Sequence, residues 1–203
     1  ELSSLGAKVL QIRSVEFASK YEMPIRVLSS FNSTGGTLIT KEESSLESAV
    51  ISGITCTNDD SKLILRNVPD TPGIAAKILS PISDAGIDID VIVQNVGSDK
   101  LTDFTFTVKN DHSDEAAKIL SNLVKTLGGG EIELVNDISK VSVVGVGMKS
   151  HAGVAAQMFK ALADEQINID MISTSEIKIS VVVSKDKAEA AVKALHDEFE
   201  LDK

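Results

Sequence analysis

Short stretches of alternating hydrophobic and polar residues are separated in this sequence by longer stretches with helical spacing. Phe104, Phe106 and Val108 occupy every second position, which is typical of a strand with one buried face. Isoleucines at 74, 78 and 82 recur at every fourth position, as on one face of a helix. The pattern predicts strands over 61–68, 87–96, 103–109 and 131–135 and helices over 72–85 and 113–127.

The order βαββαβ of these elements predicts a ferredoxin-like α+β domain over residues 61–136. An internal repeat predicts a second domain of the same kind. The segment DTPGIAAKILSPISDAGIDID (70–90) aligns without a gap with SHAGVAAQMFKALADEQINID (150–170). In the second unit we therefore expect strands over 139–146, 167–174 and 177–184 and helices over 151–165 and 186–199.

The second unit has no sixth strand of its own. The stretch VISGITCT (50–57) has the length of a strand and precedes the first unit without a partner there. We therefore predict that 50–57 completes the second sheet. The domains are then 61–136, which is contiguous, and 50–57 plus 139–203, which is discontinuous, with the first inserted into the second.

Residues 1–48 have a different pattern. A helix is predicted over 5–21 and strands over 24–31 and 38–40, followed by the polar linker KEESSLES (41–48). This segment is too small to form a core alone, so we expect its packing partner to lie elsewhere. Because the sequence begins ELSSLGAKVLQ without a methionine, we also expect it to be a fragment of a longer product.

Composition excludes several classes of partner. The 203 residues carry a formal net charge of −10 and no run of basic residues, which argues against binding to nucleic acid or an anionic membrane. No apolar run has the length of a membrane span. A single cysteine, Cys56, cannot form a disulfide within the chain, so a cytoplasmic location is expected.

Motifs for catalysis or metal binding are not evident. His112, His151 and His196 are far apart and lack the spacing of a metal site, so no metal is expected. The glycine-rich GVGMKS (145–150) has Met148 where a phosphate-binding loop needs glycine before lysine. We therefore expect neither catalytic residues nor a bound cofactor in this chain.

The segment VPDTPGIAAKIL (68–79) places a proline and a glycine at the start of a predicted helix. Backbone N–H groups at a helix start attract a carboxylate, and Gly73 and Gly153 let a ligand approach closely. Asp70 can accept from an ammonium group, and Asn168 adds a donor and an acceptor. This set suits the headgroup of an α-amino acid. The alternative is that Pro72 is simply the first helical residue and that the glycines ease packing.

Several motifs resemble one family, the aspartokinases. PDTPGIAAKI, VQNV, GMKSHAGVAAQMF, INIDMISTSEIKISVVV and ALHDEF resemble its paired ACT domains, and STSEIKIS with MKSHAG is specific to aspartokinases among ACT proteins. LGAKVL, PIRVLSSF and GTLI resemble the end of the catalytic domain. The resemblance covers essentially the whole chain. It implies two ACT domains, preceded over 1–48 by a remnant of the catalytic domain.

The resemblance implies a regulatory region that binds lysine, threonine or both and inhibits the ATP-dependent phosphorylation of aspartate in the biosynthesis of these amino acids and methionine. ATP and Mg²⁺ would serve the complete kinase. The nucleotide- and aspartate-binding motifs are absent from this chain, which should be inactive alone. The implied partners are the catalytic domain or subunit and a second copy of the chain.

Effector-binding positions also follow from the resemblance. One pocket would be formed by Asp70, Gly73, Ala75 and Gln94, facing Asn168 and Ile169, and a related pocket by Met148, Asp170, Ser175 and Glu176. The sequence departs from the family's pattern in two places. Gln11-Ile12 replaces the usual His-Pro, and Gln166 replaces the Asn common in threonine-sensitive members, which leaves the effector open. The alternative function is a dimerisation module with vestigial pockets.

Overall fold

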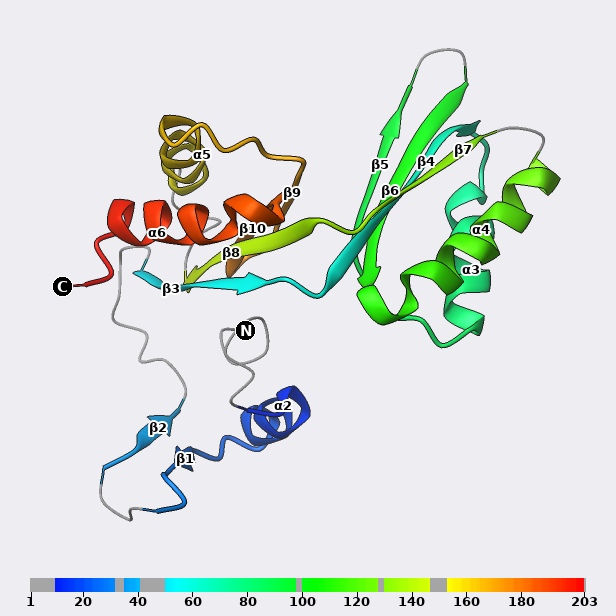
Figure 1. Ribbon diagram of the computed structural model, residues 1–203. Helices are drawn as coiled ribbons and strands as arrows, with labels where there is room; N and C mark the ends of the chain where they lie inside the picture. Colours follow the sequence, from blue (N-terminus) through cyan, green and yellow to red (C-terminus); the bar gives the residue numbers. More distant parts are fainter. Residues whose placement is uncertain are drawn as a thin grey trace.

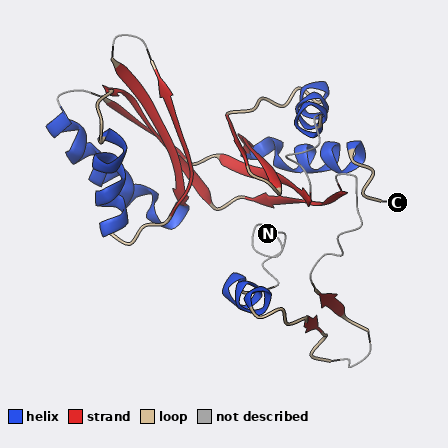
Figure 2. Ribbon diagram, turned by 180° about the vertical axis from the view of Figure 1, so that it is seen from behind, coloured by secondary structure: helices blue, strands red, loops and turns tan. Residues whose placement is uncertain are grey.

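A computed structural model describes residues 10–31, 35–40, 50–97, 100–127, 130–146 and 153–202. Two four-stranded antiparallel sheets dominate it, each with two helices on one face (Figure 1). The strands of the two sheets meet in the middle of the molecule, and the N-terminal segment lies apart from both (Figure 2).

The first sheet has the strand order β5-β6-β4-β7. Its elements are β4 (Asp60–Pro69), α3 (Ile74–Asp84), β5 (Ile89–Val96), β6 (Leu101–Lys109), a short 3-10 helix (Asn110–His112), α4 (Ser113–Leu127) and β7 (Glu131–Val135). Alternate residues of β4 and β6 point toward the helices, so that Leu63, Leu65, Phe104 and Phe106 are almost fully buried. The predicted βαββαβ order is confirmed.

The second sheet has the strand order β3-β8-β10-β9. Its elements are β3 (Val50–Thr57), β8 (Ile138–Val146), α5 (Val154–Asp164), β9 (Met171–Thr174), β10 (Lys178–Ser184), a short 3-10 helix (Lys185–Lys187) and α6 (Ala188–Glu198). β3 pairs antiparallel with β8, with Thr55 opposite Ser142. The prediction that 50–57 completes this sheet is therefore confirmed, and the first domain is inserted between β3 and β8.

Among the element boundaries that differ from the expected ones, the starts of β5 and β9 share one physical reason. β9 begins at Met171 instead of residue 167, and β5 at Ile89 instead of 87. After each preceding helix the chain first turns back, because Gly86 (φ +73°) and Gln166 (φ +56°) are left-handed. The next N–H, of Ile87 or Ile167, then donates to a carbonyl of the helix just completed.

The N-terminal segment contains α2 (Ile12–Lys20), β1 (Ile25–Val27) and β2 (Thr37–Ile39). β1 is shorter than the expected strand over 24–31, and β2 is shifted by one residue from the expected 38–40. The expected helix over 5–21 begins at Ile12, and residues 1–9 lie outside the described part. α2 has no buried residue, and Phe17, Met23 and Phe31 are largely exposed. This supports the expectation that the segment has no core of its own. No described helix has both the length and the apolar character of a membrane span.

Two short connections carry the chain between the domains, and they are alike. TNDDSK (57–62) joins β3 to β4, and VNDISK (135–140) joins β7 to β8. The carbonyl of Asp59 accepts from the N–H of Asn110, and the carbonyl of Asp137 accepts from the N–H of Lys185. Lys62 and Lys140 therefore occupy equivalent positions near the starts of β4 and β8.

Each of these two lysines forms an ion pair with the other domain. Lys62 Nζ lies 2.8 Å from Asp170 Oδ2, and Lys140 Nζ contacts Asp90 Oδ2. Asp90 and Asp170 are themselves equivalent in the sequence repeat. An apolar cluster from both domains is buried at the same junction and consists of Val91, Ile138, Met171 and Val182. The two domains are thus joined by reciprocal charges around a small shared core.

Asp60 makes this junction asymmetric. Its side chain is only 2% exposed, and its Oδ1 accepts from Lys109 Nζ at 2.6 Å. Its Oδ2 has no hydrogen bond but lies 3.1 Å from Nζ of Lys140, which is also buried. Burial lowers the pKa of Lys109, yet its hydrogen bonds to Asp60 and Asp59 outweigh burial and leave the pKa raised. Ile138 occupies the position equivalent to Asp60 in the other connection.

We predict that Gln166→Gly stabilises the protein, because a left-handed backbone costs a non-glycine residue about 1–2 kcal/mol, more than the added flexibility of glycine in the unfolded chain. The converse, Gly86→Ala, should lower the free energy of unfolding by about 1 kcal/mol, although a Cβ there meets nothing within 4 Å. Urea denaturation measures both. A loss of stability in Gln166→Gly would show that its side chain contributes more than its backbone strain.

We predict that Lys140→Met lowers the free energy of unfolding by about 3 kcal/mol, because it leaves the buried Asp60 with one of its two lysines. Lys160→Met is the matched control, since Lys160 forms a solvent-exposed pair with Asp164 at 2.8 Å, and its loss should change the free energy of unfolding little. Both changes are compared by denaturant unfolding. Equal effects of the two substitutions would contradict a structural role for the buried charges.

Candidate functional site

The starts of α3 and α5 share an unusual geometry. Gly73 and Gly153 are the N-caps of these helices, with φ of +89° and +118°. A Cβ at either position would meet nothing within 4 Å, so the glycines are required by the backbone and not by packing. Neither helix has a side-chain cap or an acidic residue in its first turn. The positive end of each helix dipole is therefore not compensated by its own sequence.

The interpretation of Pro72 as the first helical residue is wrong. α3 begins at Ile74, so Pro72 lies before the N-cap, in the turn that follows β4. The N–H of Ile74 donates to the carbonyl of Thr71 at 3.0 Å, which closes this turn. The glycine and the proline thus shape the entry into the helix, and the packing explanation for Gly73 and Gly153 is also wrong.

The structure brings the four predicted residues of the first domain to one end of its sheet. Asp70 directly follows β4, and its N–H donates to the carbonyl of Lys100 at 2.8 Å. Ala75 lies in the first turn of α3 and packs on the domain core. Gln94 is exposed on β5 opposite the core residue Phe104, which places it on the helix side of the sheet. An acidic residue, an amide and a helix start therefore lie at the same end of the sheet.

Of the predicted residues of the second domain, Asn168 and Asp170 lie at the junction between the domains. Ile169 packs on the second core, whereas Asn168 is exposed. Asp170 Oδ2 pairs with Lys62, and Asp170 Oδ1 accepts from Asn168 Nδ2 at 3.4 Å. Sequence reasoning missed Lys62, which aligns with Lys140 in the repeated connection.

Within one chain, the structure does not bring Asp70 and Asn168 together. Asn168 and Asp170 lie beside Lys62, close to the beginning of β4, and Asp70 follows the end of the same strand. Eight residues of extended backbone separate Lys62 from Asp70, a distance of about 25 Å. The predicted face-to-face pocket therefore does not form between the two domains of a single chain.

Two of the remaining predicted positions lie in a turn of the second sheet. Ser175 and Glu176 form the turn between β9 and β10, and both are exposed. The carbonyl of Ile177 in this turn accepts from the N–H of Gly145 at 2.9 Å, which fixes the turn beside the end of β8. Met148 lies outside the described residues.

Two pockets in the described part of the chain lie away from the predicted residues. One, of about 350 Å³, lies between α2 and the strands β1 and β2. The other, of about 430 Å³, lies between β3 and α6 and includes Cys56 and Val192. Burial raises the pKa of the Cys56 thiol, which donates to Asn58 Oδ1 at 3.2 Å. Cys56 is therefore not activated as a nucleophile.

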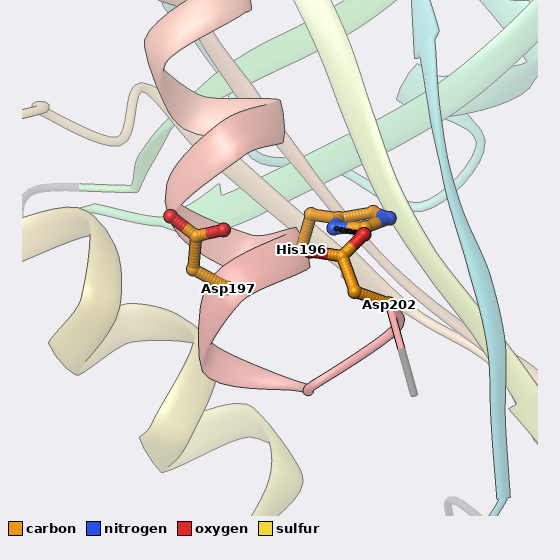
Figure 3. Close-up of side chains that lie close together, drawn as sticks. All are labelled: His196, Asp197 and Asp202. Carbon is orange, nitrogen blue, oxygen red and sulfur yellow. Dashed lines mark ion pairs between the residues drawn. The ribbon is translucent and has the colours of Figure 1, made fainter.

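Near the C-terminus, His196, Asp197 and Asp202 come close together, and sequence reasoning did not identify this group. His196 Nδ1 lies 3.6 Å from Asp202 Oδ1, but the Asp202 side chain is 81% exposed. In Figure 3, Asp197 projects from the helix away from the other two side chains. One ligand atom from each side chain lies within 4.8 Å of the others, but Asp197 and Asp202 are exposed, and exposed acidic groups are often close together without a metal, so no metal role follows.

Comparison with known proteins gives two matches to the ACT domain model, over residues 63–126 and 141–199. Aspartate kinase from Pseudomonas fluorescens (strain SBW25) is 60% identical over all 203 residues. The chain spans only 49% of that protein, about half its length.

Similar solved structures include a regulatory subunit and a longer aspartate kinase chain. The ligand-free regulatory subunit of aspartate kinase from Thermus thermophilus is 42% identical with a TM-score of 0.70, and the match covers 73% of this chain and 98% of that one. Aspartate kinase from Clostridium acetobutylicum, described as an allosteric enzyme, is 26% identical with a TM-score of 0.83, and the match covers 98% of this chain and 46% of that one.

Proposed function

The chain belongs to the aspartokinase family, as a regulatory region with two ACT domains, and we propose that it binds lysine, threonine or both as feedback effectors. Binding inhibits the ATP-dependent phosphorylation of aspartate, for which ATP and Mg²⁺ are held by the catalytic part of the complete kinase. The description of the Clostridium relative as allosteric supports this proposal.

The observation that carries the proposal is the start of α3, which offers complementary partners to the two charges of an α-amino acid. The helix start has no acidic residue and no side-chain cap, so it favours the carboxylate of a ligand. Asp70 lies three residues before Gly73 and provides an anion for the ammonium group. Gln94, on the same side of the sheet, can both donate and accept.

The second half of this pocket comes from a second copy of the chain in our proposal. Asn168 of one chain lies beside its own Lys62, and about 25 Å of β4 separate Lys62 from Asp70, so Asn168 and the adjacent Ile169 complete the pocket of a partner chain. β5 and β9 are edge strands with free hydrogen-bonding groups, and Ile92 and Ile172 are exposed on them. Such edges need a cover, and side-by-side association of ACT domains supplies it.

The N-terminal segment connects the effector sites to catalysis in this proposal. Its exposed apolar residues, which are Ile12, Phe17, Tyr21, Met23, Leu28, Phe31 and Leu38, need a packing partner. We assign that partner to the kinase domain, of which residues 1–48 are the end. The chain alone, without the remainder of that domain, is then catalytically inactive.

The alternative function is a dimerisation module with vestigial pockets. Titration calorimetry of the chain with threonine and with lysine separates the two functions. We expect heat of binding for at least one of the two amino acids and sedimentation as a dimer in its presence. Sedimentation as a dimer without any heat of binding would favour the module, and a monomer with bound effector would contradict the shared pocket.

Asp70→Ala should weaken effector binding by about 1.5–3 kcal/mol, because a ligand ammonium loses its charged hydrogen bond. Asp84→Ala, at the far end of α3, is the matched control and should leave the affinity unchanged. Gly73→Val should also weaken binding and lower the free energy of unfolding by about 1–2 kcal/mol, because of its positive φ. Unchanged affinity in Asp70→Ala and Gly73→Val would place the pocket elsewhere.

Linkage gives a further prediction for the intact kinase. If effector and substrates act on one conformational equilibrium, each must change the affinity of the other by the same factor, typically about 5–150-fold. Effector affinity is therefore measured with and without aspartate and a nucleotide. A shared equilibrium would be ruled out if the effector raised the substrate dissociation constants while the substrates left the affinity for the effector unchanged.

A further inference from the structure

The carboxylate of Asp170 contacts one side chain from each domain. Its Oδ2 accepts from Lys62 Nζ at 2.8 Å, and Lys62 belongs to β4 of the first domain. Its Oδ1 accepts from Asn168 Nδ2 at 3.4 Å, within the second domain. Asp170 therefore connects a lysine at the domain junction to an amide in the proposed effector pocket.

The contact with Lys62 determines how the Asp170 carboxylate is oriented. The Lys62 side chain is only 10% exposed, so water offers its ammonium group little alternative to Asp170. The Asp170 backbone is held as well, because its N–H donates to the carbonyl of Val182 at 2.8 Å. A carboxylate is planar, so fixing Oδ2 also fixes the direction in which Oδ1 points. The long contact to the exposed Asn168 is weak alone and depends on this direction.

We propose that Lys62 is a positioning residue of the effector pocket, which holds the Asn168 amide in its binding orientation through Asp170. The proposal rests on the proposed function in taking Asn168 as an effector contact. Because Lys62 and Asn168 belong to different domains, the orientation of the amide depends on how the domains are docked. Lys62 thus makes effector affinity sensitive to the junction between the two ACT domains.

The first domain offers a matched comparison. There Asp90 is equivalent to Asp170, Lys140 to Lys62, and Asp88 to Asn168. Asp88 is a carboxylate and has no proton to donate to Asp90 when both are ionised. The Lys140–Asp90 pair therefore joins the domains but does not orient a side-chain amide. Asp90→Asn weakens this pair, but Lys140 stays beside the buried Asp60, and the Lys62–Asp170 pair and the shared apolar cluster still hold the domains together, so it is the control.

A first experiment needs no effector. The side-chain amide signals of Asn168 are assigned in a nitrogen–proton spectrum of the full chain by their disappearance in Asn168→Asp. We expect these signals to shift in Lys62→Met, to shift little in Lys62→Arg, which retains the charge, and to stay unchanged in Asp90→Asn. An unchanged Asn168 amide in Lys62→Met, in a chain that remains folded, would overturn the proposal.

A second experiment measures affinity for threonine and lysine in a double-mutant cycle. Lys62→Met and Asp170→Asn should each weaken binding about tenfold, and the double variant should bind no more weakly than either. Asp90→Asn should bind as the unchanged chain does. Independent, additive effects of Lys62→Met and Asp170→Asn would overturn the proposal, and so would a loss of stability without a loss of affinity. If the unchanged chain binds neither amino acid, the proposed function fails, and the Asn168 signals still decide the role of Lys62.

Discussion

The arrangement of both domains depends on the charges buried where the chain crosses between the two sheets. Asp60 lies almost completely out of water between Lys109 and Lys140, and a buried carboxylate is tolerated only with such partners. Lys140 extends this network to Asp90 in the first domain, and Lys62 makes the reciprocal pair with Asp170. Four apolar side chains, of valine, isoleucine and methionine residues, form a buried cluster at the same junction. Charge pairing gives this small interface a defined geometry, which an apolar contact of its size would not specify alone.

The insertion of one domain into the other gives this geometry its functional meaning. β3 belongs to the second sheet, yet it continues after two residues into β4 of the first sheet. The first domain is therefore tied to the second by two connections, and neither domain can rotate without straining both. Residues 1–48 precede β3 directly in the sequence. A change at the junction thus has a short covalent route to the segment that we assign to the kinase domain.

The start of α3 and the domain junction lie at opposite ends of β4, and the proposed mechanism depends on this separation. Asp70 and Gly73 lie at the end of β4 that faces away from the second domain, whereas Asn168 lies at the junction (Figure 1). An effector held between these two half-sites would bridge two chains. It would favour the assembly in which the half-sites meet, because a ligand shifts an equilibrium only by its different affinity for the two states. Asp170 would then connect that bridge to the docking of the two domains.

Much of the fold could be predicted from the sequence, because local pattern and repetition carry it. Phe104, Phe106 and Val108 alternate as a strand must, and the match of 70–90 with 150–170 indicates two copies of one unit. Counting strands was then enough to assign 50–57 to the second sheet. Helix and strand starts were less accurate where a single left-handed residue, such as Gly73 or Gln166, redirects the chain. Such residues act through backbone geometry, which hydrophobic periodicity does not report.

The sequence by itself determined the identity of the two units, their strand order and the residues available for binding an amino acid. Only the tertiary structure decided which of these residues meet. Lys62 and Asp170 are 108 positions apart and become partners because the inserted domain folds back on its host. Asp70 and Asn168 make no such contact. Asp70 follows the end of β4, whereas Asn168 lies beside the beginning of that strand. Periodicity places a side chain on a face of its own element, whereas contacts between elements depend on how those faces pack, and that is fixed only when the whole chain has folded.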